Sequence, residues 1–166
     1  MFFLKKREKN LEIKNQDRNC IYAPVSGKII PLEQVNDVVF SQKMLGDGAA
    51  IEPMDNVLYS PVKGKVKVVF PTGHVVGIEG DNGADIVLHV GIDTVELKGK
   101  GFEVQVRQGD MVDAGDVLMK IDLPMIRKKY AATTMVVVEN TKDFQITYPE
   151  RYEVKAGEEL MKLVRK

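Results

Sequence analysis

The chain has 166 residues, in which 24 lysine and arginine residues balance 24 aspartate and glutamate residues, with one cysteine and two histidines. This length suits one domain with a sizeable core, and the balanced charge, with no basic stripe, argues against a nucleic-acid partner. Cys20 alone excludes an internal disulfide framework and indicates a reducing compartment, so we expect a cytoplasmic protein. No apolar run reaches the length of a membrane-spanning helix.

The first segment, residues 1–19, is predicted to be a flexible tail that precedes a domain at residues 20–166. It starts MFFLKKREKN, and this order of apolar residues before basic ones is the reverse of a signal peptide. The alternatives for this segment are a frayed tail and a weak contact with an anionic membrane surface. The residues that would make the membrane contact are Phe2, Phe3, Leu4, Lys5, Lys6, Arg7 and Lys9.

From Cys20 onward the sequence predicts short strands separated by turns. In the run at 63–69, alternation places the lysines on one face and Val66 and Val68 on the other. Runs that are short and bounded by Gly, Pro, Asn or Asp indicate an all-β, antiparallel sandwich or barrel. These runs are IYAPVSGKIIPL (21–32), VVFSQKML (38–45), AAIEPM (49–54), LYSPVKGKVKVVF (58–70), HVVGIEG (74–80), ADIVLHVGI (84–92) and GFEVQVRQGDMVDAGDVLMKI (101–121).

The C-terminal part contains the one helical period of the sequence. It covers LPMIRKKYAA (123–132), and Pro124 suits the first turn of a helix. MVVVEN (135–140) predicts a further strand, and YEVKAGEELMKLV (152–164) predicts a closing hairpin.

Two sequence themes recur along the chain. APVSGKI (23–29) is echoed by SPVKGKV (60–66), and a Val-x-x-Gly-acid pattern occurs at 106–110, 112–116 and 154–158. Glycine followed by an acid is ordinary turn chemistry and is a sufficient explanation of both themes. The recurrence of both themes nevertheless indicates pseudo-symmetric halves.

The same themes occur in biotinyl and lipoyl carrier domains, which modify a lysine on a tight hairpin. Here Lys120 lies within a strand run, and the chain is about twice as long as such a carrier needs. A carrier with a modified Lys120 is therefore the remote alternative.

The two histidines, His74 and His89, lie fifteen positions apart in β-branched runs, each near a glycine. A turn near residues 79–83 would join their strands as a hairpin and place the imidazoles side by side. Such a pair can hold a metal, act in acid–base catalysis or carry a phosphoryl group.

Other residues narrow these uses. Catalytic zinc needs three protein ligands, so Asp93 would have to help, or a partner's carboxylate would have to complete a zinc site shared with the histidines. Ser26, Ser41 and Ser60 do not lie in a nucleophile elbow, and GDG at 46–48 lacks the rest of a P-loop. These patterns favour a histidine that is itself modified.

From about Tyr22 to Arg165 the chain resembles the glucose-type IIA component of the bacterial phosphoenolpyruvate-dependent sugar phosphotransferase system. The last of the matching stretches is long and highly specific. The resemblance implies an antiparallel β sandwich with Greek-key or jelly-roll character and little helix. The stretches are APVSGKI (23–29), VVF (38–40), GDGAAIEP (46–53), SPVKGKV (60–66), FPTGH (70–74) and LHVGIDTVELKGKGF (88–102).

The resemblance also implies roles for individual residues. His89 matches the family's histidine that is phosphorylated on Nε2, and His74 matches the second histidine, which stabilises the phosphoryl group. Thr72 matches the hydroxyl that orients this second histidine, and Gly91 the residue whose carbonyl orients the phosphorylated ring. Acidic residues at the rim are matched by Asp37 and Asp93. An apolar collar that docks partners is matched by Val38, Val39, Phe40, Met44, Leu45, Phe70, Val87 and Val95.

The function implied is that of a phosphoryl carrier. It would accept phosphate from HPr on His89 and pass it to a cysteine on the IIB domain of a sugar permease, with glucose the expected sugar and no cofactor or intrinsic metal needed. The alternative is a regulatory protein that inhibits permeases or kinases when unphosphorylated, because phosphate would break those contacts. Departures from the family pattern at Gly73, Val75, Val76 and Val87 touch the collar and concern partner choice.

Overall fold

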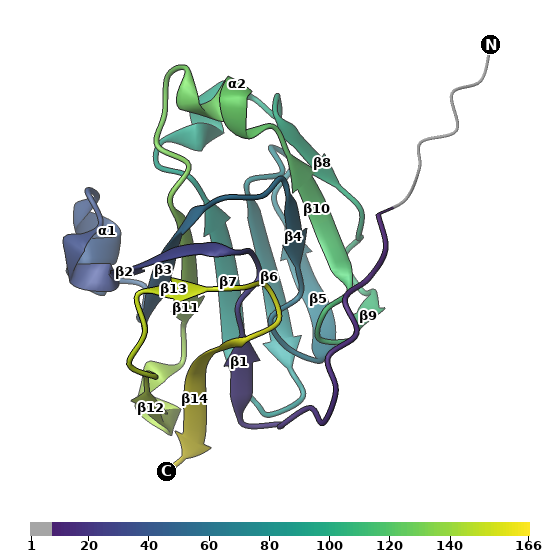
Figure 1. The fold of residues 1–166 in the computed structure, drawn as a ribbon, viewed down its shortest axis with the longest axis vertical. Helices are drawn as coiled ribbons and strands as arrows, with labels where there is room; N and C mark the ends of the chain where they lie inside the picture. Colours follow the sequence, from purple (N-terminus) through teal and green to yellow (C-terminus); the bar gives the residue numbers. More distant parts are fainter. Residues whose placement is uncertain (1–7) are drawn as a thin grey trace.

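Two layers of antiparallel strands make up the computed structural model, which describes residues 8–166 (Figure 1). One layer is an eight-stranded sheet with the order β13-β2-β3-β11-β7-β6-β5-β9, and the other consists of the sheets β1-β14-β12 and β4-β10-β8. The strands are β1 (Cys20–Tyr22), β2 (Gly27–Pro31), β3 (Asp47–Pro53), β4 (Val57–Tyr59), β5 (Gly64–Val69), β6 (Val75–Gly80), β7 (Asp85–Val90), β8 (Phe102–Val104), β9 (Met111–Val112), β10 (Val117–Ile121), β11 (Thr134–Val138), β12 (Phe144–Thr147), β13 (Glu153–Val154) and β14 (Glu159–Arg165).

The helical elements of this part of the chain are short. They are the 3-10 helices η1 (Leu32–Gln34), η2 (Thr94–Leu97) and η3 (Thr141–Asp143) and the α-helices α1 (Val38–Ser41) and α2 (Leu123–Arg127). Within residues 8–166, no helix is long and apolar enough to cross a membrane. The predicted all-β antiparallel class with little helix is therefore confirmed.

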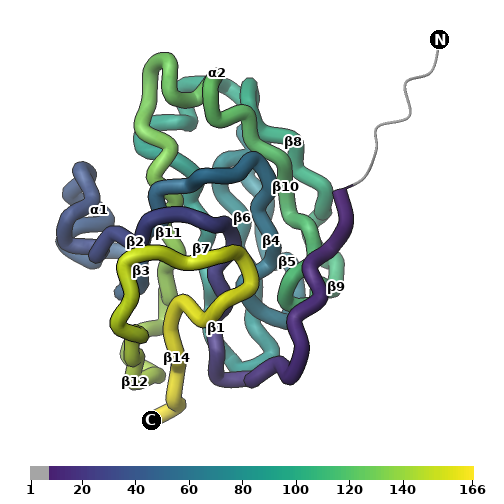
Figure 2. Tube along the Cα trace, in the orientation of Figure 1, coloured from purple at the N-terminus to yellow at the C-terminus, as the bar shows by residue number. Residues whose placement is uncertain are grey.

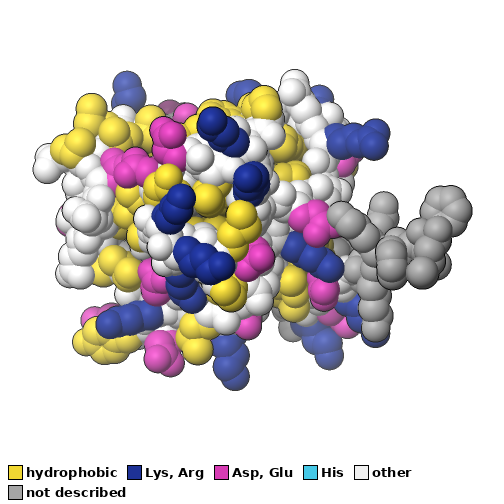
Figure 3. Space-filling model, turned by 90° about the horizontal axis from the view of Figure 1, so that it is seen from above, with side chains coloured by type: hydrophobic (Ala, Val, Ile, Leu, Met, Phe, Trp, Pro, Cys, Tyr) yellow, Lys and Arg dark blue, Asp and Glu magenta, His cyan; other side chains and the backbone are white. Residues whose placement is uncertain are grey.

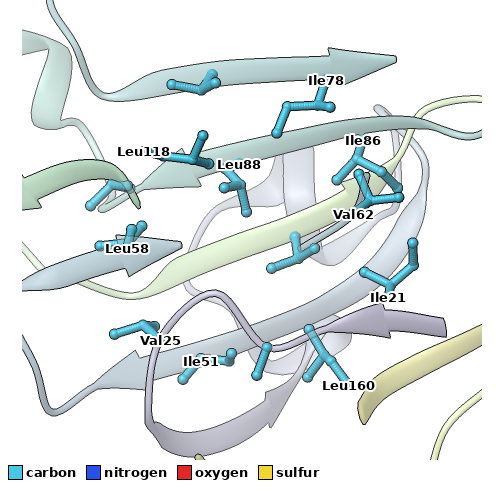
Figure 4. Packing of buried hydrophobic residues seen from close by; sticks show 14 of the residues in the cluster. Ile21, Val25, Ile51, Leu58, Val62, Ile78, Ile86, Leu88, Leu118 and Leu160 are labelled. Carbon is cyan, nitrogen blue, oxygen red and sulfur yellow. The ribbon is translucent and has the colours of Figure 1, made fainter. Parts of the chain in front are cut away.

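The main core lies between the layers, where aliphatic side chains from both meet (Figure 4). Along β7, Ile86, Leu88 and Val90 point into this core, whereas Val87 and His89 lie on the other face and are partly exposed. Because each buried aliphatic side chain contributes about 1.5–3 kcal/mol, a register slip of one residue in β7 would be costly. The core thus fixes His89 on the outer face of the sheet.

The repeated motifs bind each other reciprocally. The Tyr22 amide donates to the Pro61 carbonyl, and the Tyr59 amide donates to the Pro24 carbonyl, both at 2.9 Å. Each motif also exchanges two amide–carbonyl bonds with one Val-x-x-Gly-acid turn, Ala23 with Gly157 and Glu158, and Ser60 with Gly115 and Asp116. The two halves are therefore related by the same contacts, as the repeats indicated.

The run VVFSQKML (38–45) was predicted to be β structure, and this prediction is wrong, because residues 38–41 form α1 and residues 42–45 form a turn and a bend before β3. The Asp37 carboxylate accepts a hydrogen bond from the Val39 amide at 2.9 Å and caps the helix. Capping and the burial of Phe40 outweigh the preference of the two valines for strands.

Two further patterns were extrapolated too far. The alternation in β5 stops at a bulge between Val66 and Val68, so Val66 is buried but Val68 is turned outward and exposed. The helical period at 123–132 forms only α2, which ends at Arg127. The Asp122 carboxylate caps it and Pro124 lies in its first turn, as expected.

Residues 8–19 follow an extended path across the strands near β9 and β10 (Figure 2). The Leu11 amide donates to the Gly115 carbonyl at 2.8 Å, Asn10 Oδ1 accepts from the Val117 amide at 2.9 Å, and Arg18 Nη2 donates to the Asp81 carbonyl at 2.7 Å. This stretch is therefore held on the domain. The boundary at residue 20 stays a prediction, and residues 2–7 of the proposed membrane contact lie outside the described residues.

Lys120 lies in β10, where its ammonium forms an ion pair with Glu8 at 3.2 Å. It is thus in the middle of a sheet, and the hairpin tip that a biotinyl or lipoyl lysine needs is not formed around it. The remote alternative loses its structural basis.

Candidate functional site

The β6–β7 hairpin brings the two histidines together. The strands pair antiparallel with Val75 opposite His89, and His74 directly precedes β6. The imidazole centroids of His74 and His89 are 5.1 Å apart and the ring planes are perpendicular. The expected juxtaposition is confirmed.

The His89 ring is held by one nitrogen. Its Nδ1 lies 2.9 Å from the Gly91 carbonyl oxygen, and a carbonyl can only accept, so Nδ1 carries the proton. In the neutral ring the lone pair is then on Nε2. Burial, and next the neighbouring His74, lower the pKa of His89 to about 4, against the opposite influence of the Gly91 carbonyl, Asp37 and Asp93. The ring is therefore neutral at pH 7 with a nucleophilic Nε2.

Gly91 owes its identity to the turn after β7. Its φ is +84°, and an added Cβ would lie 2.2 Å from Thr94 Cγ2. The Gly91 amide also donates to the Thr133 carbonyl of the chain preceding β11, at 2.8 Å. The carbonyl that holds His89 is thus part of a backbone segment that only glycine can supply.

His74 is buried and is held by Thr72, whose Oγ1 lies 2.8 Å from His74 Nδ1. Burial lowers the pKa of His74, so this ring too is neutral at pH 7. Phe70 and Phe102 lie beside it, with ring centroids 5.8 and 6.3 Å from that of His74. Gly73 has a φ of +76° and a Cβ there would approach Phe102 Cβ to 3.0 Å, so the tight turn explains glycine at this departure from the family pattern.

The two rim acids flank His89 from different elements. Asp37 caps α1, and Asp93, in the left-handed conformation with φ 61°, precedes η2 and is exposed. Both carboxylates favour the protonated form of His89. Their position therefore suits an electrostatic role towards any charge placed on that ring.

The residues predicted as an apolar collar divide into two groups. Val38, Met44, Leu45, Phe70 and Val95 are exposed by 44–68%. Phe40 is instead buried, with its ring edge-on to His89 at 4.9 Å between centroids, and Val39 and Val87 are partly buried.

Phe40 therefore packs against the His89 ring from the buried side of the site. It belongs to a small second core under α1 that also contains Leu32, Val35, Ala50, Met135 and Val137. Of the departures from the family pattern, Val75 and Val76 are buried, so they do not face a partner.

Two residues of this region were missed by the sequence reasoning. Val68 was expected on the same face as Val66, which is buried, but the β5 bulge exposes Val68 opposite Gly77, where a Cβ would lie 2.7 Å from Val68 Cγ1. Thr94 is fully buried and its hydroxyl donates to the Val90 carbonyl. The exposure of Val68 could have been predicted only if the position of the bulge were known. No motif singles out Thr94.

The histidine pair belongs to the face of the large sheet that carries α1. The end around α2, seen from above in Figure 3, shows basic, acidic and hydrophobic side chains interspersed, and no histidine is visible there. In the described part of the chain, no group of three or more His, Cys, Asp or Glu residues is placed to hold a metal. His74 and His89 alone supply two ligands, one short of a catalytic zinc site.

A neutral imidazole whose lone pair is on Nε2, a second imidazole beside it and exposed apolar side chains are features that suit a protein that carries a chemical group on histidine. The chain belongs to the family described as phosphoenolpyruvate-dependent sugar phosphotransferase system, EIIA 1, whose profile matches residues 19–144. It is thus a phosphotransferase component, and the family expected from the sequence is confirmed.

Similar proteins agree with this assignment. The chain is 42% identical over 160 residues to the PTS system glucose-specific EIIA component of Halalkalibacterium halodurans, covering 95% of this chain and 92% of that one. It is 40% identical to part of a glucose-specific EIICBA component of Staphylococcus saprophyticus, covering 95% of this chain and 23% of that protein. The solved glucose permease IIA from Mycoplasma capricolum superposes with a TM-score of 0.81 at 38% identity, covering 97% of this chain and 98% of that one.

Proposed function

We propose that this phosphotransferase component accepts a phosphoryl group from HPr on Nε2 of His89 and passes it to the cysteine of a IIB domain, with glucose the transported sugar. The observation that carries the proposal is the bond from His89 Nδ1 to the Gly91 carbonyl, which leaves Nε2 as the reacting nitrogen. The names of the relatives, glucose-specific EIIA and EIICBA components, support the sugar and a permease partner.

The transfer needs two displacements at phosphorus. The lone pair of His89 Nε2 attacks the phosphorus of the donor's phosphohistidine, a P–N bond forms, and the donor's P–N bond breaks with its electron pair returning to the donor ring. A cysteine thiolate of the acceptor then attacks the same phosphorus, the P–N bond to His89 breaks, and His89 returns to its neutral form. In-line positioning is the main requirement for both steps.

His74 is suited to stabilise the phosphoryl group. If Thr72 donates its hydroxyl proton to His74 Nδ1, the neutral His74 ring carries its proton on Nε2 and can donate it to a phosphoryl oxygen. A neutral donor lowers the transition-state energy without binding the phosphoryl group as tightly as a cation would. Thr72 thereby has the role of orienting His74.

The rim acids act on the charge of the phosphoryl group, and the collar residues exclude water from it. A phosphoryl group adds close to two negative charges, and the carboxylates of Asp37 and Asp93 repel it, which favours onward transfer over storage. The exposed side chains of Val38, Met44, Phe70 and Val95 offer a docking surface that excludes water while the group moves. No cofactor takes part, because the protein groups alone balance the reaction.

The experiment is a transfer assay with phosphoenolpyruvate, enzyme I and HPr, read by intact mass. Wild type should gain one acid-labile phosphate, and His89→Gln should gain none. His74→Gln should gain the phosphate but lose transfer to the IIB cysteine by at least about tenfold, the effect of one lost transition-state contact. Phosphate retained on His89→Gln, or wild type without phosphate, would refute the proposed site.

Regulatory binding is the second candidate, supported by the exposure of Val38 and Met44, at 65% and 68%. A partner that covers this surface in the unphosphorylated state would be expelled by charge on His89. A carboxylate from such a partner would also supply a third ligand for zinc at His74 and His89. Pull-downs with and without phosphorylation test this, since binding that ignores the phosphorylation state contradicts it.

A further inference from the structure

We propose that Thr94 is a positioning residue for His89, because its buried hydroxyl locks the turn whose Gly91 carbonyl sets the tautomer of that ring. The inference rests on the proposed function, in which Nε2 of His89 is the reacting atom. It assigns Thr94 no contact with the phosphoryl group.

The first observation is the contact made by the hydroxyl. Thr94 Oγ1 donates to the Val90 carbonyl, four residues back along the chain, and the residue has no exposed surface. The bond spans the segment from Val90 to Thr94, which contains Gly91. Without it, the Val90 carbonyl would be buried and would lose an acceptor interaction that water cannot replace.

The second observation is the conformation of the enclosed turn. Gly91 and Asp93 both have left-handed backbone conformations, with φ of +84° and 61°. Two such residues so close together are sparsely populated in an isolated chain, and they persist where surrounding contacts hold them. The Gly91 amide is held by the Thr133 carbonyl at 2.8 Å and the Ile92 amide by the Ala131 carbonyl at 3.0 Å.

Thr94 adds a further contact to those that hold this turn, and it does so from inside the turn. Its Cγ2 lies 2.2 Å from the position that a Cβ on Gly91 would take, so the threonine methyl occupies the space next to the glycine. The same residue begins η2, which carries the exposed Val95. Thr94 therefore joins the turn that holds His89 to the segment that presents Val95.

The consequence concerns one carbonyl. If the Thr94 hydroxyl is lost, the Val90–Thr94 segment can rotate and the Gly91 carbonyl no longer points steadily at His89 Nδ1. A neutral imidazole without this acceptor populates both tautomers, so the fraction with its lone pair on Nε2 falls. Phosphorylation slows accordingly, although every reacting group is still present.

The test compares Thr94→Val, which keeps the methyl and loses the hydroxyl, with Thr94→Ser, which keeps the hydroxyl. Side-chain ¹⁵N NMR of the unphosphorylated full chain reports the His89 tautomer, and the rate of phosphorylation by phospho-HPr reports its effect. We expect a mixed tautomer and a rate about tenfold lower for Thr94→Val, equivalent to one lost interaction, and near wild-type behaviour for Thr94→Ser. Should Thr94→Val not fold, Thr94→Ala against Thr94→Ser is the same comparison without the methyl.

A folded variant that lacks the hydroxyl but retains the Nδ1–H tautomer would overturn the proposal. So would a Thr94→Ser protein as mixed in tautomer as the variant without hydroxyl, because packing of the methyl would then be the cause. The NMR readout needs no phosphate, so a wild type that is never phosphorylated refutes the proposed function while the tautomer comparison still decides the role of Thr94.

Discussion

The pKa of His89 is the balance of effects with opposite signs. Burial and the neighbouring His74 disfavour a charged ring, while the Gly91 carbonyl and the carboxylates of Asp37 and Asp93 favour it. Burial is the largest of these effects, and the ring stays neutral with a pKa of about 4. A neutral ring is what nucleophilic attack at pH 7 requires.

This lowered pKa predicts how stability depends on pH. An unfolded chain binds a proton at His89 near pH 6.5, whereas the folded protein resists it down to about pH 4, so stability is fully present above pH 6.5 and falls as the pH is lowered between these values. We expect wild type to lose about 1.5 kcal/mol between pH 6.5 and 5 through this residue alone. Urea unfolding at several pH values measures it.

The control for this prediction is His89→Gln, which removes the titration and keeps a polar side chain in the site. Its stability should change less over the same pH range by about that amount. Identical pH dependence in wild type and variant would mean that His89 is as easily protonated in the folded as in the unfolded protein. His74, whose pKa is also lowered by burial, contributes in the same direction in both proteins.

Among the elements, α1 shows why the strand preference of a short run of residues can differ from the structure that the run forms. Its valines favour a strand, but the Asp37 carboxylate offers the first turn a hydrogen bond, and Phe40 gains a place in the small core beside His89. Burial alternates along the uninterrupted β7. The alternation predicted for residues 63–69 failed at Val68, because a bulge breaks the period without leaving a mark in composition.

The cap of α1 can be separated from its charge. Asp37→Ala should lower the free energy of unfolding by about 1 kcal/mol, the usual effect of losing an N-cap, and should loosen the helix that carries the exposed Val38. Asp37→Asn keeps a good cap and removes the carboxylate, so its stability should stay near wild type. Equal destabilisation by both substitutions would show that charge, not capping, is the role of Asp37 in stability; thermal and urea unfolding distinguish the two.

For the whole molecule, the repeated motifs place a glycine at equivalent positions in the two halves, where neighbouring strands approach closely. Gly27 and Gly64 occupy equivalent positions, and a Cβ would approach the carbonyl oxygen of Glu52 to 2.0 Å in one half and that of Glu79 to 2.2 Å in the other. These glycines let neighbouring strands of the large sheet come close, in β2–β3 and in β5–β6. The sequence repeats foretold the symmetry, although not which turns each motif would bind.

The symmetry makes a paired prediction. Gly27→Ala and Gly64→Ala should each destabilise the fold by about 2 kcal/mol or more and by similar amounts, because each forces a Cβ against backbone. Lys28→Ala and Lys65→Ala, on the exposed side of the same strands, are controls that should cost less than about 0.5 kcal/mol. Urea unfolding of the four variants measures this, and a glycine variant as stable as its lysine control would contradict the equivalence.

Much of the candidate site could also be predicted from the sequence. The long match at residues 88–102 implied His89 and Gly91, and FPTGH implied His74 and Thr72, and the structure places all four within one hairpin and its flanking turns. The burial of Phe40 depends on packing between segments that are distant in the chain. The hydrogen bond of Thr94 depends on one hydroxyl in a turn. Neither leaves a periodic or spaced pattern.

The most direct single measurement is ³¹P–¹⁵N NMR of the protein labelled with ¹⁵N-histidine and phosphorylated by phospho-HPr. Because Nδ1 of His89 is held by the Gly91 carbonyl, we predict a one-bond coupling between phosphorus and Nε2 of His89, with both nitrogens of His74 uncoupled. A coupling to Nδ1 of His89, or to either nitrogen of His74, would contradict the assignment of His89 Nε2 as the phosphoryl acceptor.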